Sequence, residues 1–297
     1  MPKPIIFVFI LFPFLSCNSQ DETKPNNVIP GAEQMHLYLP LLLNKTVGIV
    51  ANHTSRVNNI HLVDTLLNSN VDIVKIFALE HGFRGDADAG QQLDDDLDAQ
   101  TGIPIISLYG KHYKPTASDL EGIDVLLFDI QDVGVRFYTY LSSLHYVLEA
   151  SSENNIPLIL LDRPNPNGFY VDGPLLDTVY SSFVGKHPIP IVHGMTLGEL
   201  ANMMIGENWI NHANHTDLNV ILCKNYSHDS VVNIRINPSP NLQTMKAIYL
   251  YPTLGLFEGT IMSVGRGTDF PFLVFGHPEF PEGNITFIPR SIPGVST

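Results

Sequence analysis

The chain has 297 residues, of which 44% are hydrophobic and 15% are charged, so it can bury a substantial core and is not globally disordered. Its formal net charge of −14 argues against a nucleic-acid-binding protein, because no basic stripe is present to displace phosphate counterions. An anionic substrate is not excluded, since one or two local arginines suffice to bind it.

The first 17 residues have the pattern of a bacterial secretory signal. A lysine precedes an apolar run at 5–15, which is too short to span a bilayer comfortably. The residues Phe-Leu-Ser-Cys at 14–17 look like a lipobox, which predicts lipidation of Cys17 and a periplasmic lipoprotein held on a membrane. The alternative to lipidation is plain secretion, with the signal sequence cleaved near this position. The polar residues 18–35 are expected to form a flexible tether.

Apolar runs then alternate with helical or polar spacers up to about residue 180. Strands are predicted at 46–51, 71–79, 103–108, 125–130 and 157–161. Helical spacing of apolar residues predicts helices at 61–68 and from Tyr140 to at least Leu148. Near-continuous apolar strands separated by helices are typical of a parallel sheet covered on both faces, so the expected fold class is α/β.

Polar residues stand at the carboxyl ends of four predicted strands. They are Asn52, Glu80, Asp129 and Asp162. Open parallel sheets bind ligands in the crevice at that edge, so we expect a site there. Glu80 is followed by His81 and Arg84, and burying these groups is costly unless they are used or paired. A structural ion pair between Glu80 and Arg84 is the alternative.

The second half of the chain has a different composition, with predicted loops that are rich in proline and glycine. A helix is predicted from Thr196 to about Gly206, with Thr196 and Glu199 forming a capping box. Short strands are predicted at 219–223 and 231–236. Together these features indicate a second, smaller α+β domain at 181–297, whose loops face the strand ends of the first domain and form a cleft with it.

Several familiar site motifs are absent from the sequence. There is no G-x-G-x-x-G after the first strand, no P-loop, no G-x-S-x-G and no H-E-x-x-H. A dinucleotide-binding enzyme, a P-loop nucleotide hydrolase, a serine hydrolase of the elbow type and a zinc protease therefore have little support. Neither a metal nor an organic cofactor is expected.

Seven spaced motifs remain, and they are best considered together. They read Phe-Ala-Leu-Glu-His-Gly-Phe-Arg-Gly at 77–85, Phe-Asp-Ile-Gln-Asp-Val-Gly at 128–134 running on to 136–140, Leu-Asp-Arg-Pro-Asn-Pro at 161–166, Ser-Phe-Val-Gly at 182–185, His-Gly-Met-Thr at 193–196, Pro-Ser-Pro-Asn at 238–241, and Phe-Glu-Gly-Thr at 257–260 with Gly-Arg-Gly-Thr at 265–268. In this order they closely resemble the exo-β-N-acetylmuramidase family of glycoside hydrolases (the NamZ family, formerly DUF1343).

The resemblance runs from about residue 36 to the end of the chain. Leu79 stands where the family usually has proline, and Gln243 stands where proline is common. The chain also stops after 285–294, where the family normally continues, so we expect the second domain to be incomplete.

The resemblance implies a Rossmann-like catalytic domain at 36–180 with its active-site cleft against the second domain. It also implies release of N-acetylmuramic acid (MurNAc) from non-reducing ends of peptidoglycan fragments such as MurNAc–GlcNAc, in cell-wall recycling. Glycoside hydrolysis needs a carboxylic acid for the leaving oxygen and usually a second carboxylate or an acetamido group at the anomeric carbon. Glu80 is the candidate acid, oriented by His81 or Arg84. Asp129 and Asp132 are candidates for the second role.

Other residues of these motifs are expected to bind substrate. They are Arg84, Arg136, Tyr138, Asp162, Arg163, Asn165, Glu258 and Arg266, and Asn52 at the end of the first strand joins them. A forked arginine suits the lactyl carboxylate of MurNAc, and tyrosines stack on sugar faces. Three structural alternatives stay open: a helical-spacing pair of Asp132 with Arg136, a core position for Tyr138 or Tyr140, and a Glu258–Arg266 pair between the domains.

A non-catalytic lipoprotein that binds peptidoglycan through the same cleft is the main alternative function. An esterase or amidase of the same fold is a weaker one, because it needs a serine or cysteine nucleophile that the sequence does not indicate. Fold alone does not decide among the three.

Overall fold

The computed structural model of the protein describes residues 27–84, 96–110, 112–279, 283 and 285–291. Cys17, the predicted signal sequence and the first part of the predicted tether lie outside the described residues. Among the helices of the described part, none combines the length and apolar character needed to cross a membrane.

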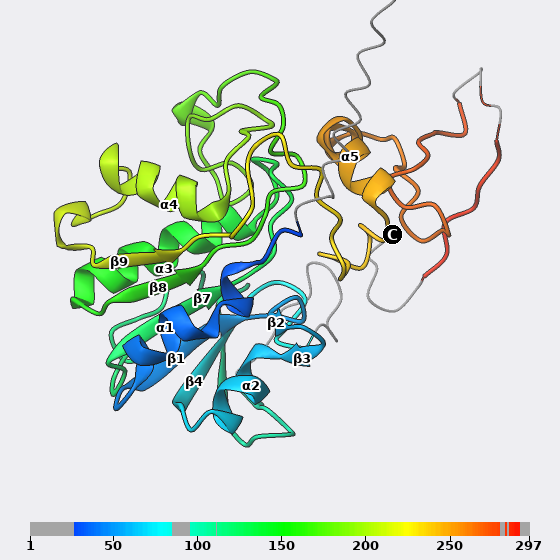
Figure 1. The fold of residues 1–297 in the computed structure, drawn as a ribbon. Coiled ribbons are helices and arrows are strands. Elements are labelled where there is room, and N and C mark those ends of the chain that lie inside the picture. The colour runs from blue at the N-terminus through cyan, green and yellow to red at the C-terminus, as the bar shows by residue number, and fades with distance from the viewer. Residues whose placement is uncertain (1–26, 85–95, 111, 280–282, 284, 292–297) are drawn as a thin grey trace, which may run out of the picture.

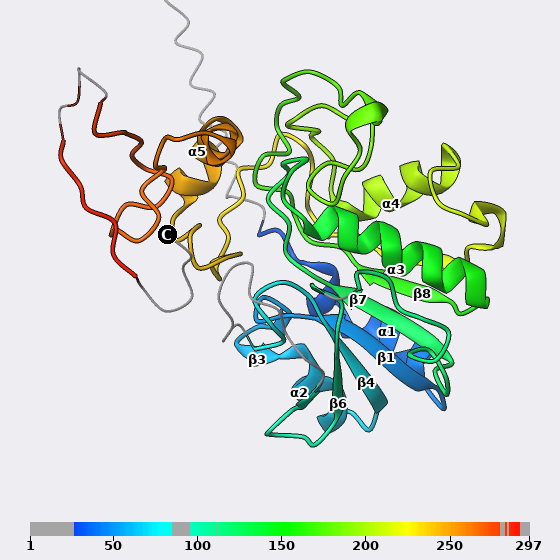
Figure 2. The same cartoon turned by 180° about the vertical axis from the view of Figure 1, so that it is seen from behind.

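In the described part of the chain, seven strands form one mostly parallel sheet in the order β5–β6–β4–β1–β7–β8–β9 (Figures 1 and 2). The strands are β1 (Thr46–Ala51), β4 (Asp72–Ala78), β5 (Asp96–Leu97), β6 (Pro104–Ser107), β7 (Val125–Asp129), β8 (Leu158–Leu161) and β9 (Leu218–Ile221). β5 is antiparallel to β6, and the other neighbouring strands are parallel. From β1 the sheet extends through β4 and β6 on one side, with β5 at that edge, and then through β7, β8 and β9 on the other, so the predicted α/β class and Rossmann-like sheet are confirmed.

Helices cover both faces of the sheet. α1 (Met35–Leu42) and α2 (Leu62–Asn68) lie on one face, while α3 (Tyr140–Asn154) and α4 (Leu197–Gly206) lie on the other (Figures 1 and 2). Within β7, Leu126 and Phe128 belong to the core under α3, and Leu127 belongs to the core under α1. Successive strand residues point to opposite faces, which is why these strands are apolar at every position.

The predicted helices and most predicted strands are confirmed within about two residues. α3 continues past Leu148 to Asn154, and its C-cap Asn155 adopts a left-handed φ of 52° and donates its N–H to the last turn. α4 has the predicted capping box, in which the Thr196 and Glu199 side chains each accept a backbone N–H.

Three regions differ from the sequence predictions. β9 pairs with β8, so the sheet extends past residue 180, where we expected the second domain to begin. Residues 231–236 have no regular secondary structure, so the strand predicted there is wrong. Val231 is 92% exposed and Val232 is buried, which is the alternation of a strand with one buried face. Within the described chain, however, no strand pairs with this segment. Residues Gly31–Glu33, placed in the tether, form the 3-10 helix η1, in which Gly31 and Ala32 are buried.

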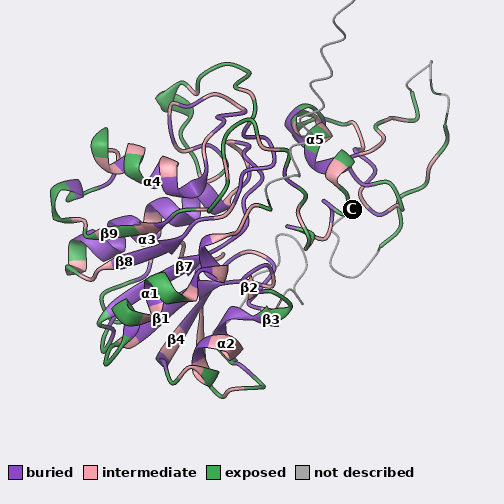
Figure 3. Cartoon of the chain, in the orientation of Figure 1, coloured by how far each residue is buried: buried purple, intermediate pink, exposed green. Residues whose placement is uncertain are grey.

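A C-terminal region beside the sheet layer contains α5 (Met245–Leu254) and the 3-10 helix η4 (Gly255–Gly259) (Figures 1 and 2). Buried residues of α5 belong to the same apolar cluster as those of α3. Figure 3 shows that burial is concentrated in the sheet and α3, whereas the outermost C-terminal loops are exposed. The remaining elements are β2 (Arg56–Val57), β3 (Ile60–His61), η2 (Thr178–Tyr180) and η3 (Ala213–His215).

Candidate active site

Glu80 lies two residues beyond β4 and lines a cavity of about 190 Å³. Its Oε1 accepts a hydrogen bond from the hydroxyl of Tyr109 at 3.2 Å, and its Oε2 accepts one from the hydroxyl of Thr139 at 3.0 Å. The hydroxyl of Tyr140 donates to the Glu80 backbone carbonyl at 3.4 Å. Burial, reinforced by the charge of Glu80, raises the pKa of Tyr109, so this hydroxyl stays protonated and can donate. Two side chains therefore fix the orientation of the Glu80 carboxylate.

His81 lines the same cavity and has an unusual backbone conformation. Its φ is +71°, in the left-handed region that residues other than glycine seldom adopt. The turn is closed by the N–H of Gly82, which donates to the carbonyl of Leu79 at 3.0 Å. Backbone strain of this kind clusters at functional sites, where the surrounding structure holds it in place.

A second carboxylate reaches this cavity from the C-terminal region. Glu258 and Arg266 both line it, and Arg266 Nε donates to Glu258 Oε1 at 2.8 Å. The guanidinium of Arg266 also lies over the ring of Phe272, 5.4 Å from its centroid. The Glu258–Arg266 pair, one of the two alternatives for Glu258, is therefore present, and both partners belong to the C-terminal region and to the wall of the Glu80 cavity.

Asp129 and Arg163 form a buried ion pair outside the lining of that cavity. Arg163 Nη2 donates to Asp129 Oδ2 at 2.8 Å, and Arg163 Nε donates to Oδ1. Asp129 is 0% exposed. Arg163 Nη2 also donates a hydrogen bond to the backbone carbonyl of Arg56 at 3.2 Å. Both oxygens of Asp129 are thus engaged in holding the ends of β7 and β8 together.

Asp132 is buried just after β7 and does not line the Glu80 cavity. Its Oδ2 accepts the N–H of Gly134 at 2.6 Å, and its Oδ1 has no hydrogen-bond partner among the described residues. Burial raises the pKa of Asp132 to about 7. Arg136 donates to the carbonyls of Pro174, at 2.7 Å, and Ile189, so the alternative of a pair between Asp132 and Arg136 is wrong.

Arg84 also makes structural contacts. It donates to Asp98 through Nε and Nη2, each at 2.8 Å, and lies 3.3 Å from Asp64. These acids draw its guanidinium away from Glu80, so the alternative of a structural Glu80–Arg84 ion pair is wrong.

The remaining candidates hold loops at the strand ends. Asn52 donates to the Tyr140 hydroxyl at 3.0 Å, while Asp162 Oδ1 accepts the N–H of Gly198, in the first turn of α4, at 2.9 Å. Burial raises the pKa of Asp162 to about 6. Asn165 Nδ2 donates to the carbonyl of Met195 at 2.9 Å.

Tyr138 lines the cavity as part of a packed aromatic group. Its ring meets those of Tyr140 and Tyr251 edge-on, with centroids 5.0 and 6.0 Å apart, and its hydroxyl donates to the Pro238 carbonyl at 2.8 Å. Because Tyr138 and Tyr140 are both buried, each is a core residue, which leaves little ring face for stacking on a sugar.

The structure thus brings Glu80, His81, Tyr138, Glu258 and Arg266 to one cavity, and places the other predicted site residues elsewhere. Two residues that hold Glu80 were not predicted. Tyr109 follows β6, so the rule that polar residues mark strand ends applies to it as well. Thr139 lies within the motif at 136–140, immediately before α3.

A doubly wound sheet with a hydroxyl-bonded carboxylate in a cavity at its carboxyl edge defines an α/β protein with a candidate acid–base site. The comparisons are more specific: the model for "Exo-beta-N-acetylmuramidase NamZ, N-terminal" matches residues 47–246, and the model for the C-terminal part matches residues 249–296. The chain belongs to this NamZ family.

Similar proteins are known by sequence and by structure. The chain is 42% identical over 275 residues to the peptidoglycan beta-N-acetylmuramidase NamZ of Bacillus subtilis (strain 168), a match that covers 87% of this chain and 64% of the length of that curated relative. A crystal structure of a DUF1343 family protein from Bacteroides fragilis NCTC 9343 has a TM-score of 0.83 and 52% identity, and the match covers 90% of this chain and 72% of that one. A second from the same strain has a TM-score of 0.76, 35% identity and coverages of 84% and 65%.

Proposed function

We propose that this chain is a glycoside hydrolase that releases MurNAc from the non-reducing ends of peptidoglycan fragments, with Glu80 as the general acid. The name of the Bacillus subtilis relative, a peptidoglycan beta-N-acetylmuramidase, supports the substrate class. The observation that carries the proposal is the placement of Glu80, which lines a cavity with one oxygen bonded to Tyr109 and the other to Thr139. A carboxyl group held in this way can deliver a proton in a fixed direction.

In the proposed reaction, the protonated Glu80 gives its proton to the glycosidic oxygen while the bond from that oxygen to the anomeric carbon breaks. The positive charge that develops on the sugar ring is stabilised by Glu258, which lines the same cavity, or by the acetamido group of the substrate. Water then adds to the anomeric carbon and its proton returns to the ionised Glu80. MurNAc and the shortened glycan are the products.

The size of the cavity supports an enzyme that acts on chain ends. Ligand pockets usually have volumes of roughly 300–1,000 Å³. The Glu80 cavity, at about 190 Å³, suits one terminal sugar better than a continuous stretch of glycan.

Arg266 is our candidate for binding the lactyl carboxylate of MurNAc. Of the four candidate arginines, Arg84, Arg136 and Arg163 face other groups, whereas Arg266 lines the cavity that contains Glu80. A substrate carboxylate would share its guanidinium with Glu258.

We also propose that Cys17, which lies outside the described residues, is lipidated and anchors the protein in the bacterial envelope.

The test compares MurNAc release from MurNAc–GlcNAc by the parent chain without residues 1–17 and by its Glu80→Gln variant. Glu121→Gln is the matched control, because Glu121 is exposed and does not line the cavity. We expect the Glu80 variant to lose roughly two to four orders of magnitude in rate, as for removal of a general acid, and the control to retain full activity. Circular dichroism establishes that each protein is folded.

Equal rates for parent and Glu80→Gln would refute Glu80 as the acid and direct attention to Glu258. A folded parent that binds MurNAc–GlcNAc without releasing MurNAc would favour a non-catalytic peptidoglycan-binding protein.

A further inference from the structure

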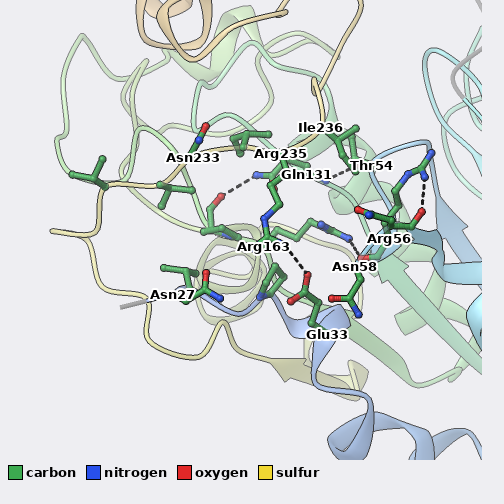
Figure 4. Close-up of a pocket in the computed structure, with 17 residues that line it drawn as sticks. Asn27, Glu33, Thr54, Arg56, Asn58, Gln131, Arg163, Asn233, Arg235 and Ile236 are labelled. Carbon is green, nitrogen blue, oxygen red and sulfur yellow. Dashed lines mark hydrogen bonds and ion pairs between the residues drawn. The ribbon is translucent and has the colours of Figure 1, made fainter. Parts of the chain in front are cut away.

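A second and larger cavity, of about 390 Å³, lies at the same edge of the sheet and shares no lining residue with the Glu80 cavity. Thr54 follows β1, Gln131 follows β7 and Arg163 follows β8, and all three line it (Figure 4). The strand order reverses between β1 and β7, and open α/β sheets bind ligands at such a reversal. Its volume is within the usual range for a ligand pocket.

The lining of this cavity is basic although the chain as a whole is acidic. Among the described residues, the lining contains Arg56, Arg163 and Arg235 and one acid, Glu33, in a chain whose net charge is −14. Asp129 neutralises Arg163 and Glu33 offsets one further charge, so Arg56 and Arg235 leave the described lining with an excess of one positive charge. A local positive field in an acidic protein favours an anionic ligand at this position.

Arg235 is the group best placed to meet that ligand. Its side chain extends from the 231–236 segment toward Glu33 (Figure 4), and Arg235 Nη1 lies 3.7 Å from Glu33 Oε1. This separation is longer than a hydrogen bond, and the Arg235 side chain is 66% exposed. The forked donors of Arg235 therefore remain available to a second carboxylate, which would compete with Glu33.

The other polar groups of the cavity are mainly side-chain amides. Asn27, Asn58 and Asn233 line it, and their amide groups make no hydrogen bond within the described part of the chain. Amides can donate to and accept from hydroxyl and acetamido groups. Apolar side chains, including Val232 and Ile236, complete the lining and can pack on a sugar ring.

We propose that this cavity binds a carboxylate-bearing amino sugar, with Arg235 on the carboxylate and the asparagine amides on the hydroxyl and acetamido groups. The choice of ligand rests on the proposed function, which supplies two sources of this chemistry: a second muramic acid residue of the glycan chain, and released MurNAc. One segment connects the sites, because Arg235 and Ile236 line this cavity while Ser239 and Asn241 line the Glu80 cavity.

The first experiment measures MurNAc binding by isothermal titration calorimetry, with GlcNAc as the probe that lacks the lactyl carboxylate. We expect Arg235→Ala to weaken MurNAc binding at this site about tenfold, since a charge-assisted hydrogen bond is lost. Glu33→Gln should strengthen it, because a competing carboxylate is removed. Lys246→Ala is the matched control: it removes one exposed positive charge outside the cavity and should change nothing.

Equal MurNAc affinity in the parent and Arg235→Ala would overturn the proposal, as would equal binding of MurNAc and GlcNAc. Because binding needs no turnover, the two proposals fail separately. An inactive parent that binds MurNAc through Arg235 refutes the hydrolase and supports this site. An active parent whose MurNAc binding is independent of Arg235 supports the hydrolase and refutes this site.

A second experiment distinguishes the two sources. If the site takes a residue of the glycan chain, Arg235→Ala raises the KM for a MurNAc–GlcNAc tetrasaccharide and leaves the KM for the disaccharide unchanged. If the site takes released MurNAc, the same variant abolishes the component of MurNAc inhibition that does not compete with substrate. Unchanged kinetics in both assays would overturn a role for the site in the reaction.

Discussion

Replacing Arg163 with methionine removes the counter-charge of a fully buried carboxylate. Asp129 is 0% exposed and the Arg163 side chain is 9% exposed, so water cannot take over the lost interaction. Both oxygens of Asp129 lose a charged donor, one of them at 2.8 Å. Methionine retains much of the apolar volume of the arginine stem, so the change tests the charge rather than the packing.

The expected loss is large because one partner of a buried pair stays behind. Breaking such a pair costs roughly 3–5 kcal/mol. For a chain of this size each kcal/mol lowers Tm by roughly 2–4 °C, so Arg163→Met should lower it by about 10 °C at pH 8.

The loss should depend on pH. Burial already raises the pKa of Asp129, and without Arg163 nothing comparable opposes that rise. A carboxyl whose folded pKa is above its ordinary value stabilises the fold fully below the ordinary pKa, and that contribution disappears as pH rises through the folded value. The deficit of Arg163→Met relative to the parent should therefore be smaller at pH 5 than at pH 8.

Urea unfolding followed by circular dichroism at the two pH values measures this effect. The double variant Asp129→Asn with Arg163→Met is the control, because it removes both charges and should recover a large part of the lost stability. Arg163→Met with the stability of the parent at pH 8, or a double variant no more stable than the single one, would refute the reasoning.

Two further predictions concern Asp132 and Cys17. Burial raises the pKa of Asp132 to about 7 from 3.8, so the parent loses a stabilising contribution as pH rises through 7, whereas Asp132→Asn does not titrate there. The stability of Asp132→Asn relative to the parent, measured by urea unfolding, should increase by a few kcal/mol between pH 5 and pH 8, and a constant difference would contradict the assignment. Cys17→Ser should abolish incorporation of labelled palmitate and release the protein from the membrane fraction, whereas continued labelling would place the lipid elsewhere.

The central strands could be predicted because burial on both faces makes them apolar throughout. β1 begins and ends at the predicted residues, and β4, β7 and β8 differ by one or two. The place of β9 in the sheet could not be predicted. It has only four residues and a mixed burial pattern, so the sequence does not reveal that it joins β8 rather than a second domain.

The partners of the charged residues were harder to predict than their positions. The pair of Asp132 with Arg136 assumed a helical turn, but Gly134 between them has a φ of +76° and the helix α3 begins only at Tyr140. A Cβ at Gly134 would lie 2.1 Å from the Asn165 side chain, so the turn needs glycine. A local spacing rule cannot detect a turn that is fixed by a contact with a distant loop.

The strand-end carboxylates are distinguished by the donors that they meet. Asp129 accepts from a guanidinium, and Asp162 accepts from the N–H of Gly198, and these groups can donate but cannot accept. Each of these donors holds its carboxylate in a structural role. Glu80 accepts from the hydroxyls of Tyr109 and Thr139, and a hydroxyl can also accept a hydrogen bond. The two hydroxyls therefore hold the Glu80 carboxyl at the wall of the cavity without neutralising it, which is the placement that we propose for the general acid.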